Sequence, residues 1–176
     1  MKPGKFVCLS FLLVGMFFST KTFGQFSGGL ELGLPLGTFS DFANPGVGLT
    51  ARYEGSIMDK INWTAATGFI YFSGKSIYGG SYGNSLIIPF LAGGKYYVFE
   101  NNKGLYGSAE LGFNFITYGT VSTVSGTSFG TASTTRLSFA PGAGYRLGQF
   151  DFSGKLSLQS DFSYLSLRAA YIFGKK

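Results

Sequence analysis

The side chains that most often carry out catalysis are scarce in this chain. None of its 176 residues is histidine, the commonest general base and the usual partner of a serine nucleophile. Asp151 and Lys155 share one face of one predicted strand and could be imagined as an acid and a base, but a packed ion pair explains the same spacing without any reaction. The sequence therefore predicts no catalytic residues and a protein that is not an enzyme.

Metal and cofactor sites are equally poorly supported. The one cysteine, Cys8, lies in an N-terminal segment that we expect to be removed, so only scattered carboxylates remain as ligands. Asp41 and Asp161, on predicted loops, would make at best a weak cation site. None of the glycines opens a predicted helix, as a phosphate-binding loop requires. We expect no cofactor and no bound metal.

The charge balance argues against nucleic acid as a partner. The formal net charge of the whole chain is +6, but without residues 1–24 it falls to +3, from 11 Lys and Arg against 8 Asp and Glu. No run of basic residues marks a binding face. The low charge, together with 28 glycines and 18% aromatic residues, instead predicts many turns and a surface that faces something other than water.

The N-terminus has the pattern of a secretory signal peptide, residues 1–24. Lys2 and Lys5 precede an apolar run, residues 6–18, that is too short to cross a bilayer as a helix. We expect cleavage after Gly24, which leaves residues 25–176 as one domain with no thiol, disulfide or lipid anchor.

Alternation of apolar and polar residues dominates the rest of the chain. No stretch shows sustained helical periodicity, and the alternation predicts strands that are each long enough to cross a membrane at a tilt. The eight predicted strands cover residues 26–35, 45–55, 61–73, 86–99, 104–118, 132–146, 149–159 and 163–173. An even number of strands is the rule for bacterial single-chain barrels.

The charged residues of these strands lie on the face opposite the large apolar residues. Val47 and Leu49, for example, share one face of their strand, whereas Arg52 and Glu54 share the other. Water-soluble sheets bury the apolar face, but a transmembrane barrel turns it outward to lipid. We therefore predict an all-β fold, an eight-stranded antiparallel up-and-down transmembrane β-barrel. Its interior is predicted to hold Glu31, Arg52, Glu54, Lys95, Glu110, Arg136, Asp151, Lys155 and Arg168.

These five basic and four acidic residues are nearly balanced in charge. Isolated buried charges are costly, so the balance predicts a network of ion pairs that fills the interior. An eight-stranded barrel is wide enough only for its own side chains or one small ligand, which argues against an open pore. A narrow ion path or proton relay along the charges remains an alternative.

Loop lengths predict how the barrel is oriented. Short connections at residues 55–60, 100–103 and 146–148 alternate with generally longer ones, such as 73–85 and 119–130. Outer-membrane barrels have short periplasmic turns and longer external loops, so both chain ends are expected on the periplasmic side. The loop 73–85 is rich in Gly, Ser, Tyr and Asn, which suits either an adaptable contact surface or a merely solvated loop.

Four segments carry a resemblance to a known family: GLELGLP at 29–35, IPFLAGGKYY at 88–97, YGSAELG at 106–112 and LRAAYIF at 167–173. In these segments the chain resembles the small outer-membrane-protein β-barrel domains, which follow a cleavable signal. The resemblance implies a place in the bacterial outer membrane, with its lipid and lipopolysaccharide as partners. It also implies assembly by periplasmic chaperones and the barrel-insertion machinery, with Phe173 as the terminal aromatic residue although three residues follow it.

The most economical function is therefore a structural or surface-interaction role for a barrel that is not an enzyme. One alternative is an adhesin or receptor whose outer loops bind an unknown extracellular ligand. Less favoured are a narrow channel and a lipid-modifying enzyme that works without histidine.

Overall fold

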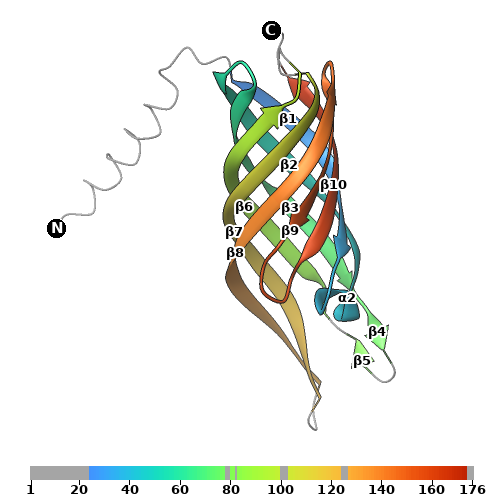
Figure 1. Ribbon diagram of the computed structural model, residues 1–176. Coiled ribbons are helices and arrows are strands. Elements are labelled where there is room, and N and C mark those ends of the chain that lie inside the picture. Colours follow the sequence, from blue (N-terminus) through green and yellow to red (C-terminus); the bar gives the residue numbers. More distant parts are fainter. Residues whose placement is uncertain (1–23, 78–79, 82, 100–102, 124–126, 174–176) are drawn as a thin grey trace, which may run out of the picture.

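A closed barrel of eight strands dominates the computed structural model, which describes residues 24–77, 80–81, 83–99, 103–123 and 127–173 (Figure 1). All neighbouring strands of the barrel pair antiparallel, and β1 closes it by pairing with β10. The predicted eight-stranded antiparallel barrel is thus confirmed. Its strands are β1 (Gln25–Pro35), β2 (Ala43–Met58), β3 (Ile61–Gly74), β6 (Ser85–Tyr97), β7 (Gly104–Thr123), β8 (Thr127–Leu147), β9 (Phe150–Ser157) and β10 (Tyr164–Phe173).

The two ends of the barrel differ. We call the end that carries the start of β1 and the end of β10 the terminal end, and the opposite end the loop end (Figure 1). Three elements that the sequence did not predict lie at the loop end: the short helix α2 (Phe39–Phe42) and the two-stranded sheet of β4 (Ser76–Ile77) and β5 (Gly80–Ser81). No helix in the described part of the chain is long and apolar enough to cross a membrane. The predicted signal peptide lies outside the described residues except for Gly24.

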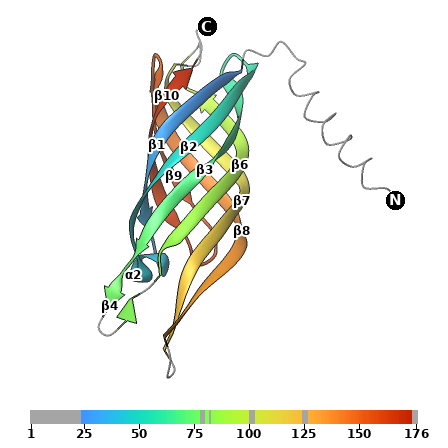
Figure 2. The ribbon, with the colours of Figure 1, turned by 180° about the vertical axis from the view of Figure 1, so that it is seen from behind.

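Strands β7 and β8 are longer than predicted. They pair without a register shift from Gly104 opposite Arg146 to Thr123 opposite Thr127, and the far part of this hairpin projects beyond the other strands at the loop end (Figures 1 and 2). We call this projecting part, residues 119–123 and 127–131, the ribbon. The longer connection predicted at 119–130 is therefore strand in its described residues, because Thr and Val there continue the strand pairing.

The surface of the barrel has the inverted polarity that the sequence predicted. On β7, the side chain of Leu111 is turned outward and its residue is 54% exposed, whereas the neighbouring Glu110 is 1% exposed inside. The same alternation leaves Leu30, Val47 and Leu137 exposed. An outward apolar belt around a polar interior is the arrangement that a bilayer stabilises.

Inward-facing glycines allow the small barrel to curve. A Cβ atom at Gly93 would lie 2.0 Å from the carbonyl oxygen of Ala109, and one at Gly112 would lie 2.0 Å from that of Phe90. Both glycines face the backbone of the adjacent strand, so any side chain there would force neighbouring strands apart. Glycine at such positions permits the close backbone approach of a strongly bent sheet.

The apolar belt predicts how outward substitutions affect stability. Leu111→Arg would place a charge against hydrocarbon near the middle of the belt and should lower the free energy of unfolding by about 2–4 kcal/mol. Thr117→Arg, outward on the same strand but nearer the loop end, should cost about 0–1 kcal/mol. Urea titration of folding into phospholipid vesicles measures both, and equal costs would contradict a lipid-facing belt.

Candidate functional site

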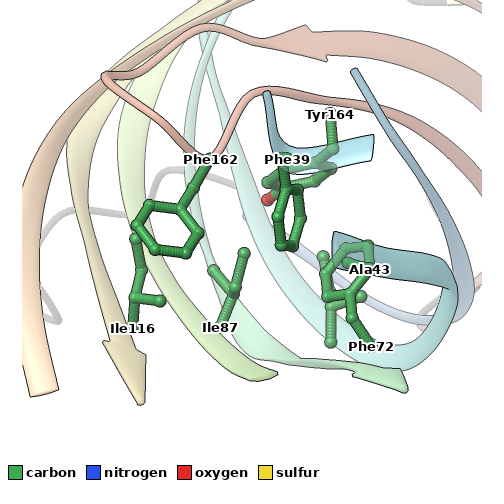
Figure 3. Packing of buried hydrophobic residues seen from close by; sticks show 8 residues of the cluster. Phe39, Ala43, Phe72, Ile87, Ile116, Phe162 and Tyr164 are labelled. Atoms are coloured by element: carbon green, nitrogen blue, oxygen red, sulfur yellow. The ribbon is translucent and has the colours of Figure 1, made fainter. Parts of the chain in front are cut away.

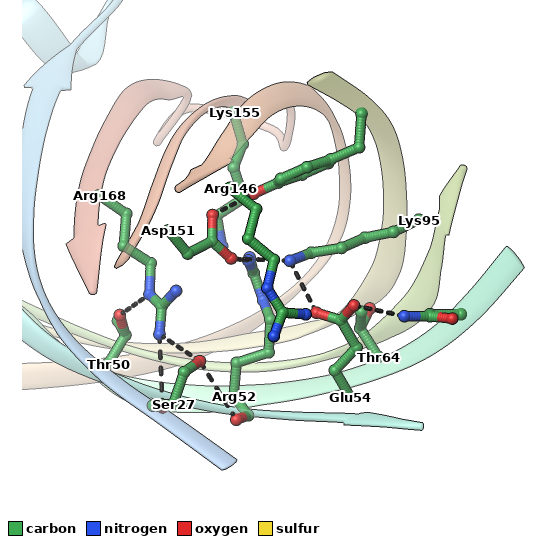
Figure 4. A network of polar contacts seen from close by, with 12 residues as sticks. Ser27, Thr50, Arg52, Glu54, Thr64, Lys95, Arg146, Asp151, Lys155 and Arg168 are labelled. Atoms are coloured by element: carbon green, nitrogen blue, oxygen red, sulfur yellow. Dashed lines mark hydrogen bonds and ion pairs between the residues drawn. The ribbon is translucent and has the colours of Figure 1, made fainter. Parts of the chain in front are cut away.

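The middle of the barrel interior holds an ion-pair network formed by residues from β1, β2, β6, β7 and β9 (Figure 4). Arg52 Nη2 lies 3.1 Å from Glu110 Oε1. Lys155 Nζ lies 3.4 Å from the other oxygen of Glu110 and 3.9 Å from Glu31 Oε1. The predicted ion pairs inside the barrel are thus present, and each links strands that are distant in the sequence.

Lys95 is the most completely coordinated cation of the network. Its ammonium lies 2.8 Å from Glu54 Oε2 on β2 and 2.8 Å from Asp151 Oδ2 on β9, and it stands 4.2 Å from the ring centre of Tyr106. Because β6, β2 and β9 lie around the barrel, this one side chain ties three strands together across the interior. A buried ammonium with two carboxylates and an aromatic face has its charge well compensated.

Three polar residues that were not predicted from the sequence complete this group. The hydroxyl of Tyr97 donates to Glu54 Oε1 (2.7 Å), and the amide of Asn62 donates to the same oxygen (2.6 Å). The hydroxyl of Tyr106 donates to Asp151 Oδ1. These three residues share the inward parity of the neighbouring charges, so the alternation could have identified them had polar as well as charged residues been assigned to a face.

Arg168 differs from the other central cations. Its Nε donates to Thr50 Oγ1 (2.8 Å) and its Nη2 to Ser27 Oγ (3.1 Å). Within the described residues no carboxylate lies within 4.0 Å of its guanidinium, and Nη1 has no hydrogen-bond partner there. Its residue is 3% exposed, so Arg168 is a buried cation held by hydroxyls rather than by an ion pair.

One predicted member of the network lies elsewhere. Arg136 has the inward parity, but it is half-buried toward the loop end, and its Nη2 lies 3.8 Å from Asp161 Oδ2 in a solvent-exposed pair. The alternation of side chains predicted the face of the sheet on which Arg136 lies, but not its height along the barrel axis. That height separates Arg136 from the other eight charged residues predicted for the interior. The weak cation site suggested for Asp161 is not supported either, because that carboxylate already faces a guanidinium.

A further inward charge, Arg146, lies at the terminal end. It was predicted to lie in a turn, but it is 8% exposed, and its Nη2 donates to Gln25 Oε1 (2.5 Å). Arg146 has the same parity as Arg136, so consistent use of the alternation would have included it.

An apolar cluster, which we call the apolar lid, fills the interior at the loop end (Figure 3). Phe39 from α2 packs against Phe72 of β3 with ring centres 4.9 Å apart, and against Phe162 of the β9–β10 connection at 5.3 Å. Two loop-end connections therefore fold inward over the strand ends. The cluster consists of Phe39, Ala43, Ile70, Phe72, Ile87, Ile116, Phe162 and Tyr164.

The lid was not predicted from the sequence. Its strand residues occupy the inward parity that lower in the barrel carries charge, and only the uninterrupted apolar runs 69–72 and 86–88 indicated that both faces are apolar there. Below the lid lies an uncharged polar layer, in which Asn114 donates to Gln159 Oε1 (2.6 Å) and the hydroxyls of Ser138 and Ser157 are 2.9 Å apart. The described side chains thus change from apolar to polar to ionic toward the terminal end.

The geometry gives no support to the acid–base pair considered for Asp151 and Lys155. Asp151 contacts Lys95 and Tyr106, whereas Lys155 contacts Glu110 and Glu31. Each group is thus engaged by a different partner within the packed interior. Among the described residues no three carboxylate, cysteine or histidine side chains come together as a possible metal site.

Fold and interior together define a transmembrane β-barrel of the bacterial outer-membrane type. The structure is similar to that of Ail, the attachment invasion locus protein of Yersinia pestis, with 15% identity, a TM-score of 0.61, and coverage of 88% of this chain and 100% of that one. It is also similar to the N-terminal barrel domain of Pseudomonas aeruginosa OprF (15% identity, TM-score 0.53, 85% and 99% covered) and to OprG from the same organism (13%, 0.53, 86% and 96%). At these identities the likeness concerns the fold.

The sequence itself matches no family model and no curated protein. One structure shows Ail in complex with the heparin analogue sucrose octasulfate, and that binding was observed for Ail.

Lys95 and Arg168 provide a matched test of the network. Lys95→Met would leave two buried carboxylates without their shared cation and should lower the free energy of unfolding by about 3–5 kcal/mol. Arg168→Met leaves no carboxylate without a partner, so the free energy of unfolding should change by no more than about 1 kcal/mol. Unfolding of both variants in the same detergent measures the difference, and a larger loss for Arg168→Met would contradict the assignment.

The filled interior predicts that the folded protein does not conduct ions. Purified protein whose electrophoretic mobility shifts on boiling, the sign of a closed barrel, should give no discrete current steps in planar bilayers. The lid closes the loop end with apolar side chains, and the central charges below it are held by ion pairs or, for Arg168, by hydroxyl groups. Current steps in the wild-type protein that disappear in Lys95→Met would contradict this prediction and support the narrow ion path.

Proposed function

We propose that this protein is an integral outer-membrane barrel that performs no catalysis and has a structural or surface-interaction role. The observation that carries the proposal is a structural difference along the barrel axis. The interior is packed with side chains that engage one another, while one hairpin projects at the loop end (Figure 2). A rigid barrel that displays one extended element suits contact at a surface better than transport or chemistry.

The lid distinguishes surface interaction from the channel alternative. Phe39, Ile70, Phe72, Ile87 and Ile116 all have zero exposure, so an ion entering from the loop end would have to displace a packed apolar cluster. Desolvating an ion in such surroundings is strongly unfavourable. The lipid-modifying alternative likewise finds no support, because Asp151 and Lys155, the acid and base considered for it, are each held by other groups of the interior.

Two further features follow from this proposal. Residues 1–24 would act as the secretory signal, with residues 25–176 as the mature domain. Phe173, outward and 51% exposed at the end of β10, would serve as the aromatic end of the last strand for the chaperones and insertion machinery. Membrane lipid and lipopolysaccharide would cover the apolar belt.

Labelling of single cysteines tests which end faces outward. Ser133→Cys lies beside the ribbon and Ser56→Cys at the terminal end, and both side chains are exposed. On intact cells a membrane-impermeant maleimide should label Ser133→Cys but label Ser56→Cys only after the outer membrane is permeabilised. The reverse pattern, or no labelling at Ser133→Cys, would overturn the proposed surface role.

A further inference from the structure

Strand β8 has a long edge without a neighbour. On one side it pairs with β7 as far as Thr127, but on the other side its pairing with β9 begins only at Gly142 opposite Lys155, with one isolated bridge from Phe139 to Leu158. Within the described residues, positions 127–135 therefore pair with β7 alone. We call this stretch the free β8 edge. It presents about 30 Å of backbone N–H and C=O groups at roughly 3.3 Å per residue.

The free β8 edge lacks the features that normally protect such edges. Proteins block exposed edges with charged residues, proline or bulges. Residues 117–135 include no charged residue and no proline, and the β7–β8 pairing shows no register shift. Thr131, Ser133 and Thr135 are exposed along one face. Threonine favours strand structure, so the edge is already shaped to accept another strand.

Charge restricts the partner that this edge can take. The basic residues at the described loop end are Lys75 and Arg136, and both are engaged: Lys75 Nζ donates to the carbonyl of Ser40 (2.5 Å), and Arg136 faces Asp161. A sulfated or phosphorylated polymer would therefore find no free cationic cluster among these residues. An uncharged edge is instead complementary to an identical uncharged edge, because no like charges are brought opposite one another.

Symmetry then determines the arrangement of two copies. A two-fold axis along the membrane normal, which relates copies in one membrane, would place two β8 edges parallel. A two-fold axis in the plane between two facing membranes places them antiparallel. The antiparallel arrangement is isologous, with each backbone hydrogen bond made twice, and antiparallel pairing is slightly more stable per residue.

We propose that the free β8 edge, residues 127–135, pairs antiparallel with the same edge of a second copy in a facing membrane, so that the protein links two membranes. The inference rests on the proposed function, because it requires the ribbon to lie outside. It names the partner as another molecule of this chain and the contact as backbone hydrogen bonds between two strands.

Proteoliposomes test the pairing with the full folded protein. Two vesicle populations carrying donor and acceptor lipids should cluster when both contain the wild-type protein, giving increased light scattering and energy transfer between vesicles. T131K/S133K in both populations should abolish clustering, and so should T131E/S133E in both. Mixing the Lys population with the Glu population should restore it, because opposite charges then meet across the paired edges.

The matched control is T38K/S160K, which adds the same charges at exposed loop-end positions outside the free β8 edge and should leave clustering unchanged. Mobility shifts on boiling verify that every variant is folded. Absence of wild-type clustering, clustering that persists in T131K/S133K, or failure of the mixed populations to recover would overturn the pairing. Labelling of Ser133→Cys separates the two proposals: if the site is labelled on intact cells but vesicles do not cluster, only the pairing fails.

Discussion

The cost of placing a charged side chain against hydrocarbon governs this structure. A bilayer provides no water to hydrate a charge or an unpaired backbone group, so the strands must close on themselves and turn their charges inward. Closure is completed by β1 against β10, where Glu31 lies opposite Arg168 on the inward face and Leu30 lies opposite Ala169 on the outward face. Because side chains alternate with a period of two, the same register that hides the charges exposes the apolar belt.

Turning charges inward creates a second requirement, because the central charged residues are then almost completely buried and need partners within the protein. The network provides these partners by sharing them. Lys95 forms ion pairs with both Glu54 and Asp151, and Glu110 forms ion pairs with both Arg52 and Lys155. These pairs connect strands that are not neighbours in the sheet, so they also oppose flattening of the barrel. Buried pairs contribute little net stability compared with apolar packing, but losing one partner is costly, which makes the arrangement sensitive to any single substitution.

The loop end combines two opposite solutions for chain that leaves the membrane. The connections after β1 and β9 fold back over the barrel and place Phe39 and Phe162 in the lid, where burial of aromatic rings stabilises them (Figure 3). The hairpin of β7 and β8 instead continues outward as a two-stranded ribbon of small polar residues (Figure 1). The loop end thus has a closed apolar lid beside a projecting ribbon.

The sequence by itself determined the number of barrel strands, because each strand is a separate alternating segment, and which face of each strand meets lipid, because only the apolar face is stable against hydrocarbon. It therefore placed Arg52, Glu110 and Lys155 inside correctly. Height along the axis and contacts between distant strands depend on strand tilt and stagger, which no local pattern encodes. Only the tertiary structure could therefore separate Arg136 from the network, bring Phe39 to Phe162 in the lid, and extend β7 and β8 into a ribbon.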